Sequence, residues 1–346
     1  MRQITDISSG RLIVVCGPTA TGKTDLAIRL AGKLGGEIVG ADSRQVYRYM
    51  DIGTAKPTPE QRARAPHHLI DVSNPDEPFS LADYLAHARA AVADITTRGR
   101  VPIVAGGTGL YARALTRGFA VPRVAPDPAL RLELERLAVI EGVAALWERL
   151  RTADPDAALV VDRNNPRRLI RAIEVAESRL LGAHASAAHR QVVAGEPPAF
   201  PGDVPVESIQ GSPPRYDALL LGLTAERAIL HTRADRRVDA MMAAGFLDEV
   251  SALYARGYAP SLPALSSLGY REFGESLRGE RPLDDAAQAT KWATHRFIRR
   301  QLTWFRGEPG IQWFDVTRAN IAADVSRLAA RWLMASEPAA HVVRSV

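Results

Sequence analysis

The sequence has little cysteine and no long hydrophobic run, and each shortage excludes a class of protein. Cys16 is the single cysteine, so no internal disulfide can form, and its place in an apolar run indicates a buried thiol without a redox role. No stretch of about 18 apolar residues occurs, and the N-terminus lacks a charged-then-apolar signal pattern. We therefore expect a cytoplasmic protein that neither spans a membrane nor is secreted.

Lysine is scarce as well. Only four of the 44 basic residues are lysines, and the other 40 are arginines. With 39 acidic residues, the net charge is +5. The planar fork of arginine suits phosphate, but a biased genome composition would also favour this residue. Charge alone therefore does not decide whether the partner is a nucleic acid. The 346 residues, 46% of them hydrophobic, are enough for a sizeable core and for two structural units.

Short apolar runs alternate with helical patterns in the first third of the chain. Runs at 11–15, 37–41 and 101–105 predict strands, a helix is expected near 81–98, and a further strand is expected at 216–223. This alternation predicts an α/β fold with a parallel, doubly wound sheet. Ligands of such sheets bind at the carboxyl ends of the strands, so functional residues should follow the first three strands directly.

The segment GPTATGKT at 17–24 matches the phosphate-loop pattern, directly after a strand and before a helix. Its glycines let backbone amides converge on phosphate oxygens, Lys23 adds charge, and the Thr24 hydroxyl can ligate Mg²⁺. A glycine-rich structural turn is a minor alternative. The residues expected around phosphate are Gly17, Pro18, Thr19, Ala20, Thr21, Gly22, Lys23 and Thr24.

A phosphate loop names a class of ligand without naming the reaction, because kinases, motors and switches share it. A typical Walker B strand ends in an acidic residue, but the strand at 101–105 leads into GGTG, and we find no clear Walker B aspartate elsewhere. This favours a small group-transfer enzyme. Asp42, which follows the second strand beside the phosphate loop, can serve as a base or a metal partner; the alternative is an ordinary turn aspartate.

The middle of the chain has a helical pattern. Leucines recur at helical spacing from 130 onward, and Asn165 followed by Pro166 predicts a helix that begins there and runs to about 181. Prolines recur in 182–214, which predicts a mobile connection, and helical patterns resume at 225–256 and 284–306.

We therefore expect two domains. Residues 1–120 and 201–346 would form a core of the P-loop NTPase type with C-terminal helices, and residues 121–200 would form a helical insertion with its linker.

Seven motifs carry a resemblance that covers most of the chain. In order they are GPTATGKT (17–24), DSRQVYRYMDIGTAKP (42–57), PHHLID (66–71), GGTGLY (106–111), NNPRRLIRAIEV (164–175), LGYRE (268–272) and RRQLTWFR (299–306). Together they resemble the tRNA dimethylallyltransferases, also called tRNA isopentenyltransferases. The chain departs from that family at Arg167-Arg168, where the family usually has Gln-Arg, and at Tyr49, where it often has glycine.

The resemblance implies transfer of a dimethylallyl group from dimethylallyl diphosphate to N6 of adenosine 37, beside the anticodon, in tRNAs that read codons beginning with U. In that family the phosphate loop holds the diphosphate rather than ATP, with Mg²⁺ assisting. The family's general base maps onto Asp42, and the threonine that contacts the reacting adenine maps onto Thr108. The arginine that grips the diphosphate resembles Arg227, with Arg233 as a close competitor, and both can instead be solvated helix residues.

The same resemblance implies where the tRNA anticodon stem-loop binds. Arg171 follows Arg167 and Arg168 at helical spacings, which predicts a basic patch, and the segment 291–306 interleaves basic and aromatic residues without an acidic one. Solvated helix faces and structural anchoring are the alternatives. The expected tRNA contacts are Asp42, Ser43, Arg44, Gln45, Thr108, Arg131, Arg167, Arg168, Leu169, Ile170, Arg171, Arg271, Arg299 and Arg300.

Two other functions stay open at this point. A P-loop kinase of a nucleoside or small metabolite shares the fold, and an RNA-binding P-loop protein could use nucleotide only as a structural ligand. We expect a monomer. His67 and His68 are adjacent on an extended segment, so they point to opposite sides and are assigned to packing rather than to a shared metal.

Overall fold

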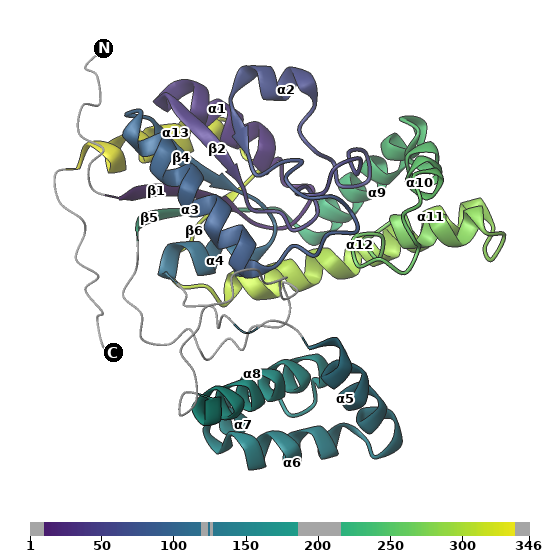
Figure 1. The fold of residues 1–346 in the computed structure, drawn as a ribbon. Coiled ribbons are helices and arrows are strands. Elements are labelled where there is room, and N and C mark those ends of the chain that lie inside the picture. Colours follow the sequence, from purple (N-terminus) through teal and green to yellow (C-terminus); the bar gives the residue numbers. More distant parts are fainter. Residues whose placement is uncertain (1–9, 119–123, 125–126, 186–215, 336–346) are drawn as a thin grey trace. The chain divides into compact units, whose positions relative to one another are not determined.

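The computed structural model describes residues 10–118, 124, 127–185 and 216–335. The chain divides into two compact units (Figure 1). The core unit consists of Met1–Glu77, His87–Thr116 and Pro214–Val346, and the helical unit consists of Pro78–Ala86 and Arg117–Pro213. Most of the predicted mobile connection at 182–214 lies outside the described residues.

A parallel six-stranded sheet forms the centre of the core unit, in the order β3-β2-β4-β1-β5-β6. The strands are β1 (Arg11–Cys16), β2 (Gly36–Gly40), β3 (His67–His68), β4 (Val101–Ala105), β5 (Asp217–Thr224) and β6 (Gln312–Asp315). The predicted parallel α/β fold and its four strands are thus confirmed, whereas β3 and β6 were not expected. Val15 pairs with Ala105, so the ends of β1 and β4 meet at one edge of the sheet.

The core unit contains the helices α1 (Lys23–Leu34), α2 (Pro59–Arg64), α3 (Leu81–Thr97), α4 (Gly109–Arg117), α9 (Arg227–Ala243), α10 (Phe246–Ala255), α11 (Tyr270–Leu277), α12 (Leu283–Arg306) and α13 (Ile321–Met334). Some of them pack on this sheet, such as α1 and α13, and others pack on one another, such as α11 and α12. The helical pattern at 225–256 proves to be two helices, since Gly245 has a φ of +92° and separates α9 from α10. Leu30 of α1 and Val325 of α13 belong to one buried cluster with Ile13 and Ile103 of the sheet.

The helical unit contains α5 (Pro128–Ile140), α6 (Val143–Ala153), α7 (Pro155–Val160) and α8 (Pro166–Ala185). Helix α8 begins where the Asn165-Pro166 pair predicted, and the Asn165 side chain accepts a hydrogen bond from the Arg168 amide at 3.3 Å. The helical unit has a hydrophobic cluster of its own, which includes Leu134, Leu146 and Leu169. The predicted helical character of this segment is therefore confirmed.

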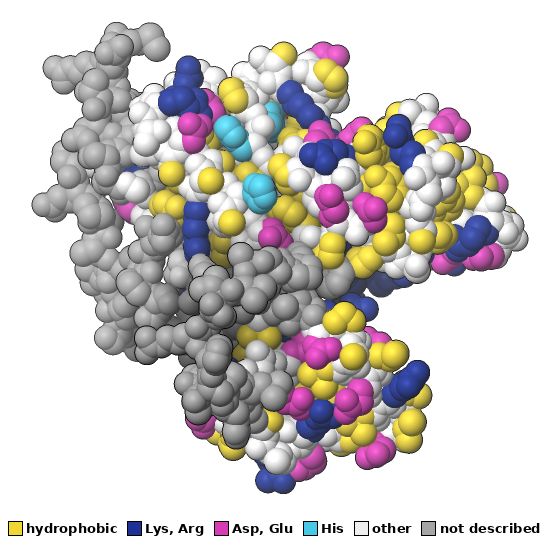
Figure 2. All heavy atoms as spheres, viewed as in Figure 1, with side chains coloured by type: hydrophobic (Ala, Val, Ile, Leu, Met, Phe, Trp, Pro, Cys, Tyr) yellow, Lys and Arg dark blue, Asp and Glu magenta, His cyan; other side chains and the backbone are white. Residues whose placement is uncertain are grey.

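The surface carries both signs of charge. In the view of Figure 2, Lys and Arg side chains are scattered among Asp and Glu side chains, with hydrophobic side chains between them. None of the described helices is both long enough and apolar enough to cross a membrane.

Candidate active site

The phosphate loop connects β1 to α1 as predicted, and its glycines are required by its geometry. Gly17 has a φ of +129°, and a Cβ atom there would lie 2.3 Å from the carbonyl oxygen of Leu223 on the neighbouring strand. Gly22, with a φ of +78°, directly precedes the first residue of α1. The backbone between them can therefore form a tight cradle at a helix N-terminus, which favours anions.

Lys23 places its ammonium group inside this loop. Its Nζ donates a hydrogen bond to the carbonyl oxygen of Pro18 at 2.6 Å. Burial and, secondly, the charge of Arg237 lower the pKa of Lys23 to about 8, whereas the charge of Asp42 opposes the shift. A bound anion would raise this pKa again, because it favours the charged form of the amine.

Asp42 and Thr108 are brought together by the adjacent ends of β2 and β4. The Thr108 hydroxyl accepts a hydrogen bond from the Ser43 amide at 3.0 Å, and the Thr108 amide donates to the Ala41 carbonyl at 3.1 Å. A Cβ atom on Gly106 would lie 2.0 Å from the Ala41 carbonyl oxygen, so a glycine is needed for this approach. The predicted GGTG and DSRQ motifs therefore meet at one point.

The Asp42 carboxylate also accepts a hydrogen bond from the Arg44 amide at 2.9 Å. This contact is typical of an ordinary turn aspartate, which was the alternative interpretation of Asp42. Asp42 also lines both cavities described next, so the turn contact does not exclude a role in the site.

Two cavities meet at Asp42. The larger has a volume of about 880 Å³ and is lined by the phosphate loop, by residues of the segment 51–58 and by α9. The smaller has a volume of about 330 Å³ and is lined by Ser43, Thr108 and residues of α9 and α12. Five residues line both cavities: Thr19, Asp42, Thr54, Arg237 and Met241.

Arg237 is a site residue that the sequence reasoning missed. It is half-buried on α9, its Nη1 lies 3.4 Å from the Thr19 hydroxyl, and burial lowers its pKa while the charge of Asp42 opposes the shift. Arg227 is exposed in the first turn of α9 and lines neither cavity, and the exposed Arg233 lines a separate groove along α1. Helical spacing alone could not single out Arg237. Arg227 and Arg233, each three residues from the buried Leu230, share its face as well.

Gln301 of α12 is a second missed residue. It is only 6% exposed, its Oε1 accepts a hydrogen bond from the Thr19 amide at 2.9 Å, and its Nε2 donates to the Gly107 carbonyl at 2.9 Å. A Cβ atom on Gly109 would lie 2.0 Å from the Trp304 indole, so α12 packs directly on the GGTG loop. Helix α12 thereby ties the phosphate loop to the loop that carries Thr108.

The residues expected to contact tRNA in the core unit occupy different environments. The Gln45 amide donates to the Thr54 and Ala55 carbonyls at 3.1 and 3.0 Å, so it orders its own loop, and Arg44 donates to the Pro263 carbonyl at 3.0 Å. Arg271 is exposed and paired with Glu272 and Glu275. Arg299 and Arg300 are both exposed on α12, and Arg300 lines the smaller cavity.

The arginines of the helical unit divide into structural and exposed ones. Arg171 is only 3% exposed and pairs with Glu174 at 3.2 Å, and Arg131 binds the same carboxylate at 2.6 and 2.8 Å. The expectation that Arg171 contributes to a basic patch is therefore wrong, because its side chain is buried and paired with Glu174. Arg167 is exposed and Arg168 half-buried.

Leu169 and Ile170 have buried side chains in the hydrophobic cluster of the helical unit. Only their backbone groups remain for a contact with RNA, and their tRNA-binding role stays a prediction.

Tyr49 shows what its departure from the family pattern means. It adopts a φ of +66°, a left-handed conformation that glycine accepts without strain, and the Arg256 guanidinium lies 4.3 Å from the centre of its ring.

His67 and His68 pack as expected, the first against the Ala65 carbonyl and the second against Glu37, each at 2.8 Å. Among the described residues there is no group of three or more His, Cys, Asp or Glu side chains that could hold a metal ion.

The parallel sheet, the phosphate loop and the carboxylate at the end of the neighbouring strand define a P-loop enzyme that transfers a group from a phosphorylated donor. Residues 45–308 match the family model described as IPP transferase, and residues 10–70 match the model described as isopentenyl transferase. The chain belongs to the tRNA dimethylallyltransferase family, whose fold is of the P-loop NTPase type.

Individual relatives agree with this assignment. The tRNA dimethylallyltransferase of Roseiflexus sp. is 47% identical and the alignment covers 93% of this chain and 98% of that one; the corresponding enzyme of Anaeromyxobacter sp. is 47% identical, with 95% and 99% covered. The crystal structure of the tRNA isopentenylpyrophosphate transferase from Bacillus halodurans has a TM-score of 0.66 and 36% identity, covering 94% of this chain and 97% of that one.

A eukaryotic dimethylallyltransferase whose structures show it acting on tRNA has a TM-score of 0.71 and 26% identity, covering 93% of this chain and 78% of that one. The chain is therefore similar to a tRNA-modifying prenyltransferase along nearly its whole length. A metabolite kinase, the alternative left open by the sequence, is not favoured.

Proposed function

We propose that the protein transfers a dimethylallyl group from dimethylallyl diphosphate to N6 of adenosine 37 in tRNAs that read codons beginning with U. The position of Asp42 carries this proposal. Asp42 lines the larger cavity together with the phosphate loop, and it lines the smaller cavity together with Thr108. A donor in the first cavity and an adenine in the second would meet at this carboxylate.

The larger cavity suits the donor. The phosphate-loop amides and Lys23 surround the position of the diphosphate, and Arg237 adds a second positive charge beside Thr19. Negative charge grows on the diphosphate as its bond to the allylic carbon breaks, and fixed positive groups stabilise that charge without reorganising. The apolar side chains of Ile52, Ala55 and Met241 line the same cavity and can contact the dimethylallyl group.

The smaller cavity suits the acceptor. The N6 amine of adenine is a poor nucleophile, because its lone pair is delocalised into the ring. Asp42 assists by accepting the amine proton as the new nitrogen–carbon bond forms and diphosphate leaves. Thr108 and the ring of Phe297 line this cavity and can hold the base, which must first leave the stack of the anticodon loop.

The residues present fit a Mg²⁺ ion held together with the substrate. Thr24 lines the larger cavity, and the Ser or Thr at this position of a phosphate loop offers its hydroxyl to Mg²⁺. Mg²⁺ usually keeps several waters and binds few protein oxygens together with the phosphates of a substrate. When bound, the ion would neutralise charge on the departing diphosphate.

The anticodon stem-loop is the proposed partner. Arg299 and Arg300 expose guanidinium groups on α12, and Arg167 exposes one on α8. Such groups contact phosphates and stack on unpaired bases. We propose that the helical insertion, residues 121–200, contacts the RNA as a domain, that the enzyme acts as a monomer, and that it works in the cytoplasm, where its substrate is.

A reconstituted reaction tests the proposal. The purified chain, Mg²⁺, dimethylallyl diphosphate and an anticodon stem-loop are incubated without ATP, and the nucleosides are identified by mass spectrometry. We expect N6-dimethylallyladenosine at position 37 and one diphosphate released for each product. Failure to form this nucleoside, together with consumption of ATP in a parallel sample, would instead support a kinase.

A binding protein without catalytic activity predicts a third result. It would bind the stem-loop with unchanged affinity after Asp42→Ala and would form no product with either chain.

A further inference from the structure

The segment from Met50 to Lys56 contributes to the walls of both cavities and lies against Glu249 of α10. Its Ile52, Ala55 and Lys56 line the larger cavity, Gly53 lines the smaller one, and Thr54 lines both. The position of this segment therefore decides the shape of the wall beside Asp42.

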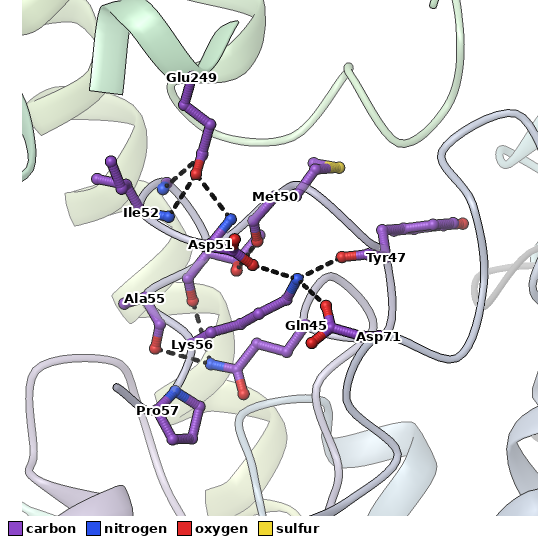
Figure 3. A network of polar contacts seen from close by, with 12 residues as sticks. Gln45, Tyr47, Met50, Asp51, Ile52, Ala55, Lys56, Pro57, Asp71 and Glu249 are labelled. Atoms are coloured by element: carbon purple, nitrogen blue, oxygen red, sulfur yellow. Dashed lines mark hydrogen bonds and ion pairs between the residues drawn. The ribbon is translucent and has the colours of Figure 1, made fainter. Parts of the chain in front are cut away.

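The segment is ordered from within by a buried amine. Figure 3 shows the Lys56 ammonium group between Asp51, Asp71 and the Tyr47 carbonyl. Its Nζ lies 2.7 Å from the Asp51 carboxylate and 2.6 Å from the Asp71 carboxylate, and the Lys56 side chain is only 2% exposed. These contacts close the segment through Asp51 and tie it to Tyr47 and Asp71, but they do not attach it to the helices.

Glu249 makes that attachment. Its Oε2 accepts hydrogen bonds from the amides of Asp51 at 2.8 Å and Ile52 at 2.7 Å, and its Oε1 accepts from the Gly53 amide at 3.1 Å (Figure 3). The fourth donor is the hydroxyl of Tyr270, at 2.6 Å. Hydrogen bonds to a charged acceptor are the strong ones, so a single carboxylate of α10 holds three successive amides in one geometry.

The packing beside this contact is equally close. Tyr270 is fully buried at the start of α11, and its ring packs edge-on against Phe246 with centroids 4.9 Å apart. A Cβ atom on Gly53 would lie 2.2 Å from the Phe246 ring, so only glycine lets the loop reach the carboxylate. Burial, with the charge of Glu249, raises the pKa of Tyr270 well above its usual value, so its hydroxyl stays a donor.

We propose that Glu249 is a positioning residue for the prenyl transfer: its carboxylate fixes the 50–56 loop so that Thr54 and its neighbours hold donor and adenine in line beside Asp42. Glu249 lines neither cavity, so it acts through the loop. The proposal rests on the proposed function, because the loop walls the two cavities assigned there to donor and acceptor. Displacement of a positioning element by about 1 Å can cost 100-fold in rate.

Three variants test it. Glu249→Ala removes all four acceptor contacts, Glu249→Gln keeps the size but turns one acceptor into a donor that faces amide donors, and Asp248→Ala removes the preceding carboxylate, which is exposed. For each we would measure thermal unfolding, amide hydrogen exchange, affinity for the stem-loop, and kcat and KM with both substrates.

We expect Glu249→Ala to lower kcat about 100-fold with stem-loop affinity close to wild type, and to speed exchange at the amides of 51–53 while the sheet stays protected. Glu249→Gln should be intermediate and Asp248→Ala normal. Full activity of Glu249→Ala despite faster exchange would overturn the proposal, as would an activity loss that follows protection lost throughout the core unit. If the alanine variant does not fold, the glutamine variant decides by the same criteria.

The two proposals fail separately. A wild-type chain that forms no modified adenosine contradicts the proposed function. An active wild-type chain with an equally active Glu249→Ala contradicts only the positioning role.

Discussion

Three charged side chains lie at or beside the junction of the two cavities. Asp42, Lys23 and Arg237 supply one negative and two positive charges within one site. The charge of Arg237 lowers the pKa of Lys23, and the charge of Asp42 opposes the lowering of the pKa values of both Lys23 and Arg237. An anionic donor relieves the repulsion between the two cations. The site is therefore prepared for a diphosphate rather than for a neutral ligand.

Arg237 should matter more for the reaction than Arg227, which the family resemblance suggested. Removing one preorganised donor to a developing anion typically costs about 10²-fold in kcat, so we expect a loss of this size for Arg237→Ala. Arg227 is exposed and lines neither cavity, and Arg227→Ala should remain closer to wild type. Steady-state kinetics with varied dimethylallyl diphosphate compare the two, and the opposite order would return the role to Arg227.

The lowered pKa of Lys23 predicts a pH dependence. Lys23 is protonated below its pKa of about 8, so its attraction for diphosphate is fully present below that pH and is lost as the pH rises above it. Diphosphate dissociation constants measured between pH 6 and pH 10 should therefore increase above about 8. Lys23→Arg stays charged over this range and corrects for titration of the ligand itself; an equal rise for both chains would refute this origin.

At the scale of elements, local patterns were sufficient for the four longer strands, the phosphate loop and the start of α8, because these depend on neighbouring residues. Strand β3 has two residues and β6 has four, too few for a periodic signal. Arg237 and Gln301 were missed for another reason. Arg237 is 218 positions and Gln301 is 282 positions away in sequence from Thr19, to which both are hydrogen-bonded, so only tertiary packing brings them to the loop. Arg171 was misjudged because helical spacing does not say which face points inward.

Helix α12 should serve two purposes on two faces. Gln301→Ala leaves the Thr19 amide and the Gly107 carbonyl without their partner, and an unmade buried hydrogen bond costs about 1–3 kcal/mol of unfolding free energy. Arg299→Ala alters an exposed side chain and should leave stability unchanged while weakening stem-loop binding. Denaturant unfolding and a binding titration of both variants check this division, and it fails if Gln301→Ala keeps full stability.

At the scale of the whole molecule, the core unit and the helical unit each have a hydrophobic cluster and a set of arginines of their own. The modest net charge of +5 does not distinguish two kinds of arginine. Some form internal ion pairs, such as Arg171 with Glu174, and others are exposed. Total charge is therefore a poor guide to where RNA binds.

This difference can be measured in the helical unit. Arg171→Ala should lower its unfolding free energy by about 1–3 kcal/mol, because two hydrogen bonds of a buried guanidinium are lost. Arg167→Ala should leave stability unchanged and reduce the salt dependence of stem-loop binding by about one phosphate contact. Calorimetry and titrations at several salt concentrations separate the two effects, and equal loss of binding in two fully stable variants would contradict the assignment.

Asp42 has the central role in the proposed reaction, as the group that accepts the proton of the adenine amine. The most direct measurement is the single-turnover rate of N6-dimethylallyladenosine formation by Asp42→Asn, with stem-loop affinity measured on the same variant. We predict a rate lower by about 10²–10⁴-fold with stem-loop affinity nearly intact. A rate close to wild type, or a loss of stem-loop affinity as large as the loss of rate, would contradict this role.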